Sequence, residues 1–187
     1  LLAALKRGAR FHAPTEATRI ASGRDTVTIE TKDGPSVTAD HAVLTTGYEL
    51  TDIAPAADHR IISTWAIATA PQPRKVWPQE AFIWEAADPY LYMRVTRDGR
   101  VICGGEDQEF TDEKERDALI ARKCAAISRK LAALFPQLDT MAQFAWAGSF
   151  GTTTTGLPII RQVPRHPRIH AAMGYGGNGI TYSQIAS

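Results

Sequence analysis

Residues 174–183, GYGGNGITYS, place four glycines within six positions after a short apolar segment. Gly174, Gly176 and Gly179 formally satisfy G-x-G-x-x-G, in which glycines let a backbone turn approach a pyrophosphate at a helix start. That fingerprint also needs a following strand and an acidic residue about 20 positions further on, and no Asp or Glu follows Asp139. A cofactor held by this loop would therefore be held differently. The alternative is a glycine-rich cap and turn without a ligand.

The first part of the sequence predicts a helix end, a hairpin and a short strand. Residues 1–7 are typical of the last turns of a helix that Gly8 closes. The turn residues 32–35, KDGP, follow an alternating apolar segment, which favours a β-hairpin. Residues 42–44, AVL, form a continuous apolar run before Thr-Thr-Gly. Such a run is expected of a buried strand that delivers a loop to a crevice.

The middle of the sequence predicts an antiparallel sheet and one long helix. Residues 60–110 carry mainly strand signals, with Asp98-Gly99 as a two-residue hairpin turn. Residues 112–135 predict a helix that starts at Asp112 and stops before Pro136. Its apolar face, at helical spacing, consists of Ile120, Cys124, Ile127, Leu131 and Leu134. Cys124 is therefore expected in the core, and two more strands are expected over 141–150 and 168–173.

Composition excludes several classes of function. The net charge of +1, from 21 basic and 20 acidic residues, gives no field that favours nucleic acid or an anionic membrane surface. No apolar run approaches the roughly 20 residues that span a bilayer. Cys103 and Cys124 alone predict neither a disulfide framework nor a zinc site, and a cytoplasmic protein is expected. The sequence starts at Leu1 without Met, and we expect it to be a piece of a longer protein.

Two motifs resemble a catalytic or a metal-binding motif but lack residues or geometry that such a site needs. Residues 147–151, AGSFG, differ by one residue from the nucleophile elbow of hydrolases, but the acid that must follow Ser149 is missing. His166 and His170 are four positions apart, yet Pro167 argues against a helix that presents both to one metal. Neither a hydrolase nor a metal site is predicted, and no catalytic side chain is assigned.

Four separated segments agree on one family: DHAVLTTGYE, DPYLYMRVTRDGRVICGGED, FAWAGSFGTTTTGLPII and RIHAAMGYGGNGITYSQIA. Together they resemble the C-terminal half of FAD-dependent oxidoreductases of the D-amino-acid oxidase type, which include glycine, sarcosine and gamma-glutamylputrescine oxidases. The resemblance implies a mixed α/β fold. A partial Rossmann-like FAD-binding domain would comprise residues 1–58 and 145–187, and residues 59–144 would form an inserted substrate domain with an antiparallel sheet and a helix.

The resemblance also implies which residues lie near FAD. Thr45, Thr46 and Gly47 match a strand end that passes the diphosphate and adenosine side, although a simple tight turn is the alternative for Gly47. A segment beside the flavin ring is matched by Gly156, Leu157 and Pro158, and Thr155 stands where the family commonly has Asp. The glycine loop would lead into a helix whose start faces the pyrimidine edge of the flavin. The residues of this loop and helix start are Gly174, Gly176, Gly177, Asn178, Gly179, Ile180 and Thr181.

Some family members attach flavin covalently through a Cys just before the Gly-Leu-Pro segment. The matching residues here, 147–155, contain no Cys, so we expect non-covalent FAD. Trp65, Tyr92 and Arg94 fall in the inferred substrate domain and are expected to contact the substrate. Arg94 would clamp a substrate carboxylate, with an exposed strand arginine as the alternative.

The activity implied by the resemblance is oxidation of a C–N bond of a small amine or amino acid by hydride transfer to flavin. The family grips the ADP half of FAD through an N-terminal βαβ unit. We therefore expect this chain alone to be inactive and to hold FAD weakly or not at all. The alternative function is that of a cofactor-free binding or scaffold module that kept the fold. The electron acceptor and the oligomeric state stay open.

Overall fold

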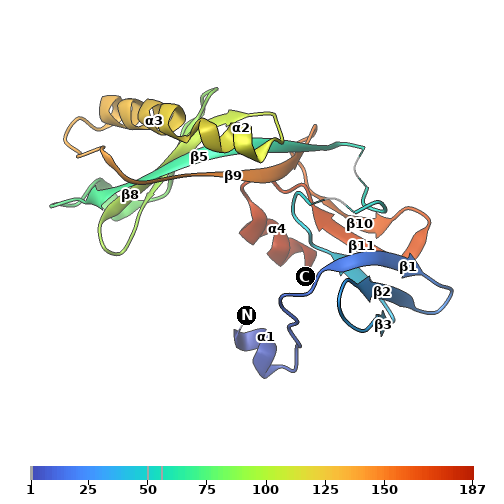
Figure 1. Cartoon of the computed structure of the whole chain (residues 1–187). Helices are drawn as coiled ribbons and strands as arrows, with labels where there is room; N and C mark the ends of the chain where they lie inside the picture. The colour runs from blue at the N-terminus through green and yellow to red at the C-terminus, as the bar shows by residue number, and fades with distance from the viewer. Residues whose placement is uncertain (1, 50, 56) are drawn as a thin grey trace.

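The computed structural model describes residues 2–49, 51–55 and 57–187, and its strands form three sheets (Figure 1). The large sheet has the order β6-β7-β8-β5-β9 with antiparallel neighbours throughout. Its strands are β5 (His59–Pro71), β6 (Ile83–Trp84), β7 (Leu91–Val95), β8 (Arg100–Gln108) and β9 (Ala142–Thr153). The antiparallel sheet expected from the sequence is confirmed. The expectation about the start at Leu1 lies outside the described residues.

Two smaller sheets lie at the right of Figure 1, and the long strands β5 and β9 run toward them. One has the antiparallel order β1-β2-β3, which confirms the expected hairpin. The other has the order β10-β11-β4, with β11 antiparallel to β10 and parallel to β4. Their strands are β1 (Ala17–Ser22), β2 (Val27–Thr31), β3 (Val37–Ala39), β4 (Ala42–Leu44), β10 (Ile159–Val163) and β11 (His166–Met173).

Two helices cover one face of the large sheet, α2 (Glu113–Ala118) and α3 (Ile120–Leu134), which lie above it in Figure 1. Asp112 caps α2 as expected, because its side chain accepts a hydrogen bond from Glu115 N at 2.9 Å. The prediction of one continuous helix was wrong at Leu119. The Leu119 N–H bonds to Arg116 O at 3.1 Å, a tighter turn than the α-helix makes, and it separates the two helices.

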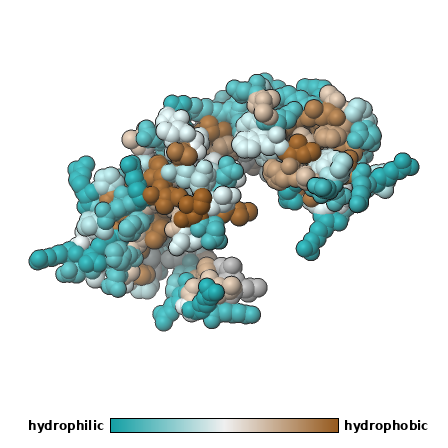
Figure 2. Space-filling model, turned by 180° about the vertical axis from the view of Figure 1, so that it is seen from behind, coloured by the Kyte–Doolittle hydropathy of each residue, from teal (hydrophilic) through white to brown (hydrophobic). Residues whose placement is uncertain are grey.

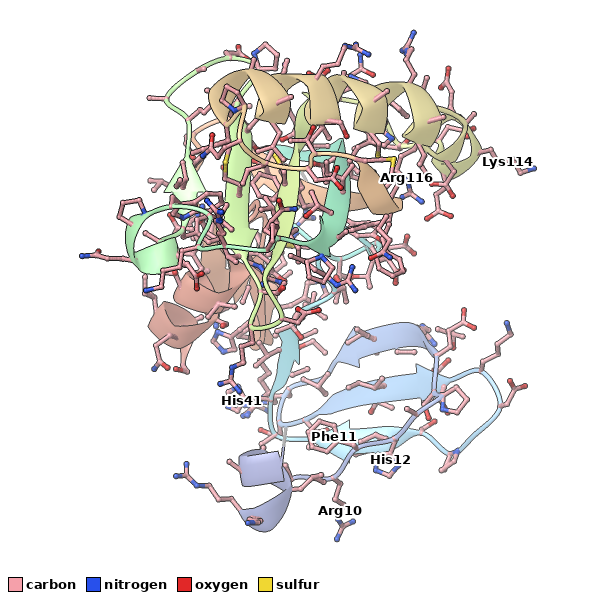
Figure 3. All side chains as sticks on the ribbon, turned by 90° about the vertical axis from the view of Figure 1, so that its left-hand side faces the viewer. Arg10, Phe11, His12, His41, Lys114 and Arg116 are labelled. Atoms are coloured by element: carbon pink, nitrogen blue, oxygen red, sulfur yellow. The ribbon has the colours of Figure 1, made fainter. Side chains whose placement is uncertain are left out.

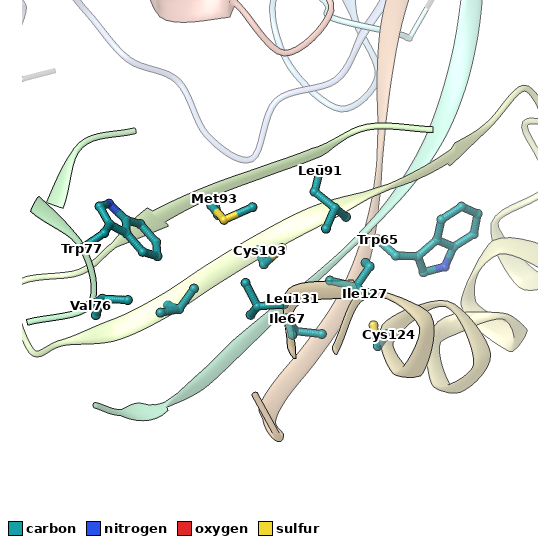
Figure 4. Close-up of a cluster of buried hydrophobic side chains, with 11 residues drawn as sticks. Trp65, Ile67, Val76, Trp77, Leu91, Met93, Cys103, Cys124, Ile127 and Leu131 are labelled. Atoms are coloured by element: carbon teal, nitrogen blue, oxygen red, sulfur yellow. The ribbon is translucent and has the colours of Figure 1, made fainter. Parts of the chain in front are cut away.

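The core of the large sheet lies between the sheet and α3 (Figure 4). Trp65 and Ile67 from β5 meet Ile127 and Leu131 from α3, and all four are fully buried. Each such side chain stabilises the fold by about 1.5–3 kcal/mol. Cys124 is 4% exposed and belongs to this core, as its place on the helix predicted.

A second core lies in the smaller sheets, where Val27 from β2 packs with Leu44, Ile169 and Met173. The expectation of a fully buried strand at residues 42–44 was only partly right. Ala42 and Leu44 are buried, but Val43 between them is 61% exposed. Successive side chains of a strand point to opposite faces, and the described residues cover only one face of β4.

The connection between β7 and β8 is longer than the two-residue turn that Asp98-Gly99 predicted. Thr96 N donates to Arg100 O at 2.9 Å, so residues 97–99 form the loop, and Gly99 has φ 82°. This is a three-residue hairpin loop whose glycine takes the left-handed conformation. The hairpin was therefore predicted correctly, but its turn type was not.

The remaining helical elements are short: α1 (Leu2–Lys6), the 3-10 turn η1 (Pro78–Glu80) and α4 (Gly179–Ala186). Figures 1 and 3 agree that α4 lies on the side of the large sheet away from α3. The expected domain boundary at residues 58 and 59 falls at the start of β5, whereas that at 144 and 145 falls inside β9. Among the described helices, none is long and apolar enough to cross a membrane.

Candidate functional site

The glycine loop between β11 and α4 is held against β9. Gly176 N donates to Gly151 O at 2.8 Å. Gly174 has φ 67° and is buried, and a Cβ added to it would stand 2.9 Å from Thr153 Cγ2. Glycine is therefore required at position 174 by both backbone conformation and packing. These contacts fix where the loop delivers the start of α4.

Gly177 has no such explanation within the chain. Its φ is not in the left-handed region, and no heavy atom lies within 4 Å of the place where a Cβ would stand. Beside it, Asn178 makes no side-chain cap, and the helical bonds of α4 begin with Tyr182 N, which donates to Asn178 O at 3.1 Å. In the described chain the N–H groups of residues 179–181 are thus without protein partners. A glycine beside free N–H groups leaves room for a ligand with acceptor atoms.

The segment from Thr153 to Pro158 forms a tight loop next to the glycine loop. Thr153 Oγ1 donates to Leu157 O at 2.7 Å, and Leu157 N donates to Thr155 Oγ1 at 3.3 Å. Thr155, which stands where the family resembled by the sequence commonly has Asp, thus helps to shape this loop. Gly156 has φ 70°, and Leu157 is 63% exposed, so the loop presents an apolar side chain to its surroundings.

The end of β4 lies beside the end of β11, because the two strands are parallel and pair at Leu44 and Ala171. Thr45 and Thr46 are exposed there, and Gly47 turns the chain with φ 67°. A cavity of about 500 Å³ opens on this side of the sheet. Its lining includes Val43, Thr45, Ile160, Arg161, Tyr175 and Tyr182. Of the two segments, Thr45 of the Thr-Thr-Gly turn and Tyr175 of the glycine loop line the same cavity.

His59, at the start of β5, lies where these segments meet and was missed by the sequence analysis. Its ring fills the space beside Gly151, where a Cβ would overlap the imidazole, and it lies 3.5 Å from the Cβ position of Gly174. Both ring nitrogens are buried and have no hydrogen-bond partner of ordinary geometry among the described residues. Burial lowers the pKa of His59. Only its long-range contacts mark this residue, so no local sequence signal would have found it.

The face of the large sheet opposite α3 carries two of the three predicted substrate residues, Tyr92 and Arg94. Register places Trp84, Tyr92, Gly104, Ala66 and Trp146 in one row across the five strands. We call this surface the opposite face. Tyr92 lies across Gly104, and Arg94, two positions further along β7, is exposed on the same face.

Trp65 does not belong to the opposite face. Its side chain is fully buried under α2 and α3, where Nε1 donates to Arg116 O at 3.0 Å and Lys123 Nζ lies 4.8 Å from the ring centroid. Arg116 is marked in Figure 3. The structure thus leaves no surface of Trp65 for a substrate. The sequence analysis assigned Trp65 to the site because it is an aromatic residue in a predicted strand, but the sequence did not show which face of the sheet its side chain takes.

Tyr90 and Asp107, also missed by the sequence analysis, stand at one end of the opposite face. Tyr90 Oη donates to Asp107 Oδ2 at 2.6 Å. Burial, together with this carboxylate, raises the pKa of Tyr90, and burial raises the pKa of Tyr92. Tyr90 therefore stays neutral while it donates its hydrogen bond to Asp107. No group of His, Cys, Asp and Glu side chains in the described part of the chain is placed to hold a metal ion.

The model of the FAD dependent oxidoreductase family matches residues 1–187. The chain belongs to this family. The resemblance to the D-amino-acid oxidase type, and with it the mixed α/β fold, is confirmed. No curated protein matches the chain.

Solved structures of family enzymes share the fold at low identity. Glycine oxidase from Geobacillus kaustophilus has a TM-score of 0.81 at 19% identity, over 98% of this chain and 49% of that chain. Glycine oxidase from Bacillus cereus ATCC 14579 has a TM-score of 0.78 at 20% identity, over 99% of this chain and 51% of that chain. L-alpha-glycerophosphate oxidase from Mycoplasma pneumoniae, solved with FAD bound, has a TM-score of 0.74 at 16% identity, over 99% of this chain and 51% of that chain. This family chain thus spans about half the length of these enzymes.

Proposed function

We propose that the chain is the part of an FAD-dependent amine or amino-acid oxidoreductase that holds the flavin ring and the substrate. The observation that carries this proposal is the junction of the glycine loop and α4. There the described chain leaves the N–H groups of residues 179–181 without partners beside an open Gly177. Membership of an FAD-dependent family and the length of the chain relative to its structural neighbours support the same function.

The residues at this junction fit a flavin ring. FAD, when bound, supplies the hydride-accepting chemistry of such an enzyme. The start of α4 presents N–H donors and the positive end of a helix dipole, which stabilise negative charge by on the order of 0.5–2 kcal/mol. Leu157 and Ile180, 63% and 91% exposed, offer apolar surface that a planar ring would cover. Cys103 and Cys124 are both buried in the core of the large sheet, which supports non-covalent binding.

The opposite face supplies the substrate side of the proposed site. It lies on the same side of the large sheet as α4 in Figure 1, and Figure 2 shows that the molecule has a concave outline between its two ends. Arg94 is exposed on this face, and the Tyr92 ring lies over it across Gly104. Arg94 would hold a substrate carboxylate by charge-assisted hydrogen bonds, and Tyr92 would orient the substrate and exclude water. The oxidised bond is a C–N bond of the substrate.

The full-length protein tests this function. Purified protein should show the visible absorption bands of a flavin, released by denaturation because it is bound non-covalently. Anaerobic addition of amines and of D- and L-amino acids should bleach those bands with at least one compound. A protein that folds but neither carries nor takes up FAD would contradict the proposal and favour a cofactor-free binding module. Bound flavin that no amine reduces would contradict C–N oxidation alone.

A further inference from the structure

A carboxylate and three aromatic rings lie together at one end of the opposite face. Tyr90 Oη donates to Asp107 Oδ2 at 2.6 Å. The Tyr90 ring meets Trp84 edge to face with 5.5 Å between ring centroids, and its centroid lies 6.4 Å from that of Tyr92. We call this group the aromatic-acid cluster. Trp84 is 62% exposed and the other three side chains are partly exposed, so a ligand can contact the cluster from the Trp84 side.

Two adjacent glycines of β8 place this cluster. Gly104 leaves the space that the Tyr92 ring occupies. Gly105 has φ 145°, and a Cβ there would overlap the carbonyl oxygen of Tyr90. Strand β8 therefore approaches Tyr90 closely enough for Asp107 to accept a hydrogen bond from the Tyr90 hydroxyl. The close approach is a property of the backbone and does not depend on a bound molecule.

The charge of Asp107 is left uncompensated, in contrast to that of its neighbour. Glu106 turns to the helix side, where it pairs with Lys123 at 3.5 Å and with Lys130. Within residues 2–49, 51–55 and 57–187, Asp107 makes no ion pair, and its Oδ1 is buried without a hydrogen-bond partner. One oxygen is satisfied by a neutral hydroxyl, and the other has unused acceptor capacity. The opposite face thus has a negative end next to the faces of electron-rich rings.

We infer that the aromatic-acid cluster recognises a second, positively charged group of the substrate, apart from the amine that is oxidised. This inference rests on the proposed function. Carboxylates and aromatic faces both attract ammonium groups, and the attraction grows where water is excluded. Arg94 lies on the same face of β7, four residues beyond Tyr90 and thus roughly 13 Å away. The substrate class is therefore a diamine or an amino acid with a basic side chain.

The test uses the full-length holoenzyme and pairs of substrates that differ only in the distal charge. Cadaverine is compared with n-pentylamine, and lysine, in both configurations, with norleucine. We expect kcat/KM for flavin reduction to favour the charged member of each reactive pair by about tenfold or more. Asp107→Asn should lower this preference about tenfold while changing the rate with the uncharged member far less. Glu109→Gln, a change at an exposed acid that pairs with Arg60, should leave the preference unchanged.

Trp84→Leu provides a second variant, and because the Trp84 side chain is 62% exposed we expect this variant to fold. It should also weaken the preference, and cadaverine should quench the tryptophan fluorescence of the wild-type protein more than that of this variant. Flavin reduction that is equally fast with both members of a pair would overturn the inference and leave the proposed function intact. An Asp107→Asn variant that slows flavin reduction equally with the charged and the uncharged substrate of a pair would also overturn the inference and leave the proposed function intact. A protein without flavin would overturn both.

Discussion

The side chain of Tyr92 lies across Gly104 on the neighbouring strand, so that a Cβ at Gly104 would stand 2.9 Å from Tyr92 Cε2 and would overlap its hydroxyl. The two residues are directly paired between β7 and β8. A glycine opposite an aromatic residue lets the ring fold down over the sheet and cover the exposed backbone. The orientation of the expected substrate residue is thus determined by the strand beside it.

Gly104→Ala should displace the Tyr92 ring and destabilise the fold by about 1–3 kcal/mol, the usual effect of overpacking. Urea unfolding of the cofactor-free protein measures this loss. Gly148→Ala is the control, since Gly148 is on β9 and has no heavy atom within 4 Å of its Cβ position. Equal stability losses in the two variants would mean that the Tyr92 ring moves aside freely.

Gly177→Val should separate cofactor binding from folding. The described chain leaves open space at Gly177, so the stability of the cofactor-free protein should change by no more than about 0.5 kcal/mol. If the flavin approaches this backbone, the Kd for FAD in the full-length protein should rise about tenfold or more, because a branched side chain then occupies its place. Titration with FAD measures the Kd. An unchanged Kd would show that Gly177 faces solvent in the holoenzyme.

Arg94→Ala should weaken the enzyme only toward substrates with a carboxylate. One charged hydrogen bond is worth about 1.5–3 kcal/mol, so KM for an amino acid should rise by roughly tenfold or more. KM for the matching amine without a carboxylate should stay the same. Arg97→Ala, at an exposed arginine in the loop between β7 and β8, is the control. An unaltered KM for amino acids would make Arg94 a plain surface residue.

Local patterns predicted the elements well. Alternation and turn residues indicated the sheets, and the spacing from Ile120 to Leu134 indicated the helix over the core. The break at Leu119 could not be seen, because it arises from one backbone bond to Arg116 and not from a helix-breaking residue. The face of each strand was also hidden. Trp65 and Tyr92 are both aromatic residues in strands, and only the register of the assembled sheet buries Trp65 under the helices and leaves Tyr92 partly exposed on the opposite face.

Residues of the candidate site could be proposed from the sequence where a family motif includes them, but not where distant segments create their environment. The glycine loop and the Thr-Thr-Gly turn could be recognised from their sequence motifs. His59 gains its environment from Gly151 and Gly174, more than ninety positions away in the chain. Asp107 is distinguished from Glu106 only by the side of the sheet to which each turns. Such differences follow from tertiary packing and leave no trace in local composition.

The two cysteines should be inert in the folded protein. Cys103 is fully buried, and burial raises its pKa to about 12, while burial also raises the pKa of Cys124. The thiolate is the reactive form, so at about pH 8 neither residue should react with a disulfide reagent. Both should react once urea unfolds the chain. Titration of free thiols in the two states measures this, and rapid labelling of the native protein would contradict the placement of both residues in the core.

His59 should make the cofactor-free protein sensitive to acid. Burial lowers its folded-state pKa below the ordinary value of 6.5. The unfolded chain therefore binds a proton first as the pH falls, so the stability due to neutral His59 is complete above about pH 6.5 and is lost as the pH falls toward the folded pKa. His59→Asn should flatten the fall in urea midpoint in that window, whereas His12→Asn, at an exposed residue, should leave it as in the wild type. A His59→Asn variant with the wild-type slope would show that other groups cause the acid sensitivity.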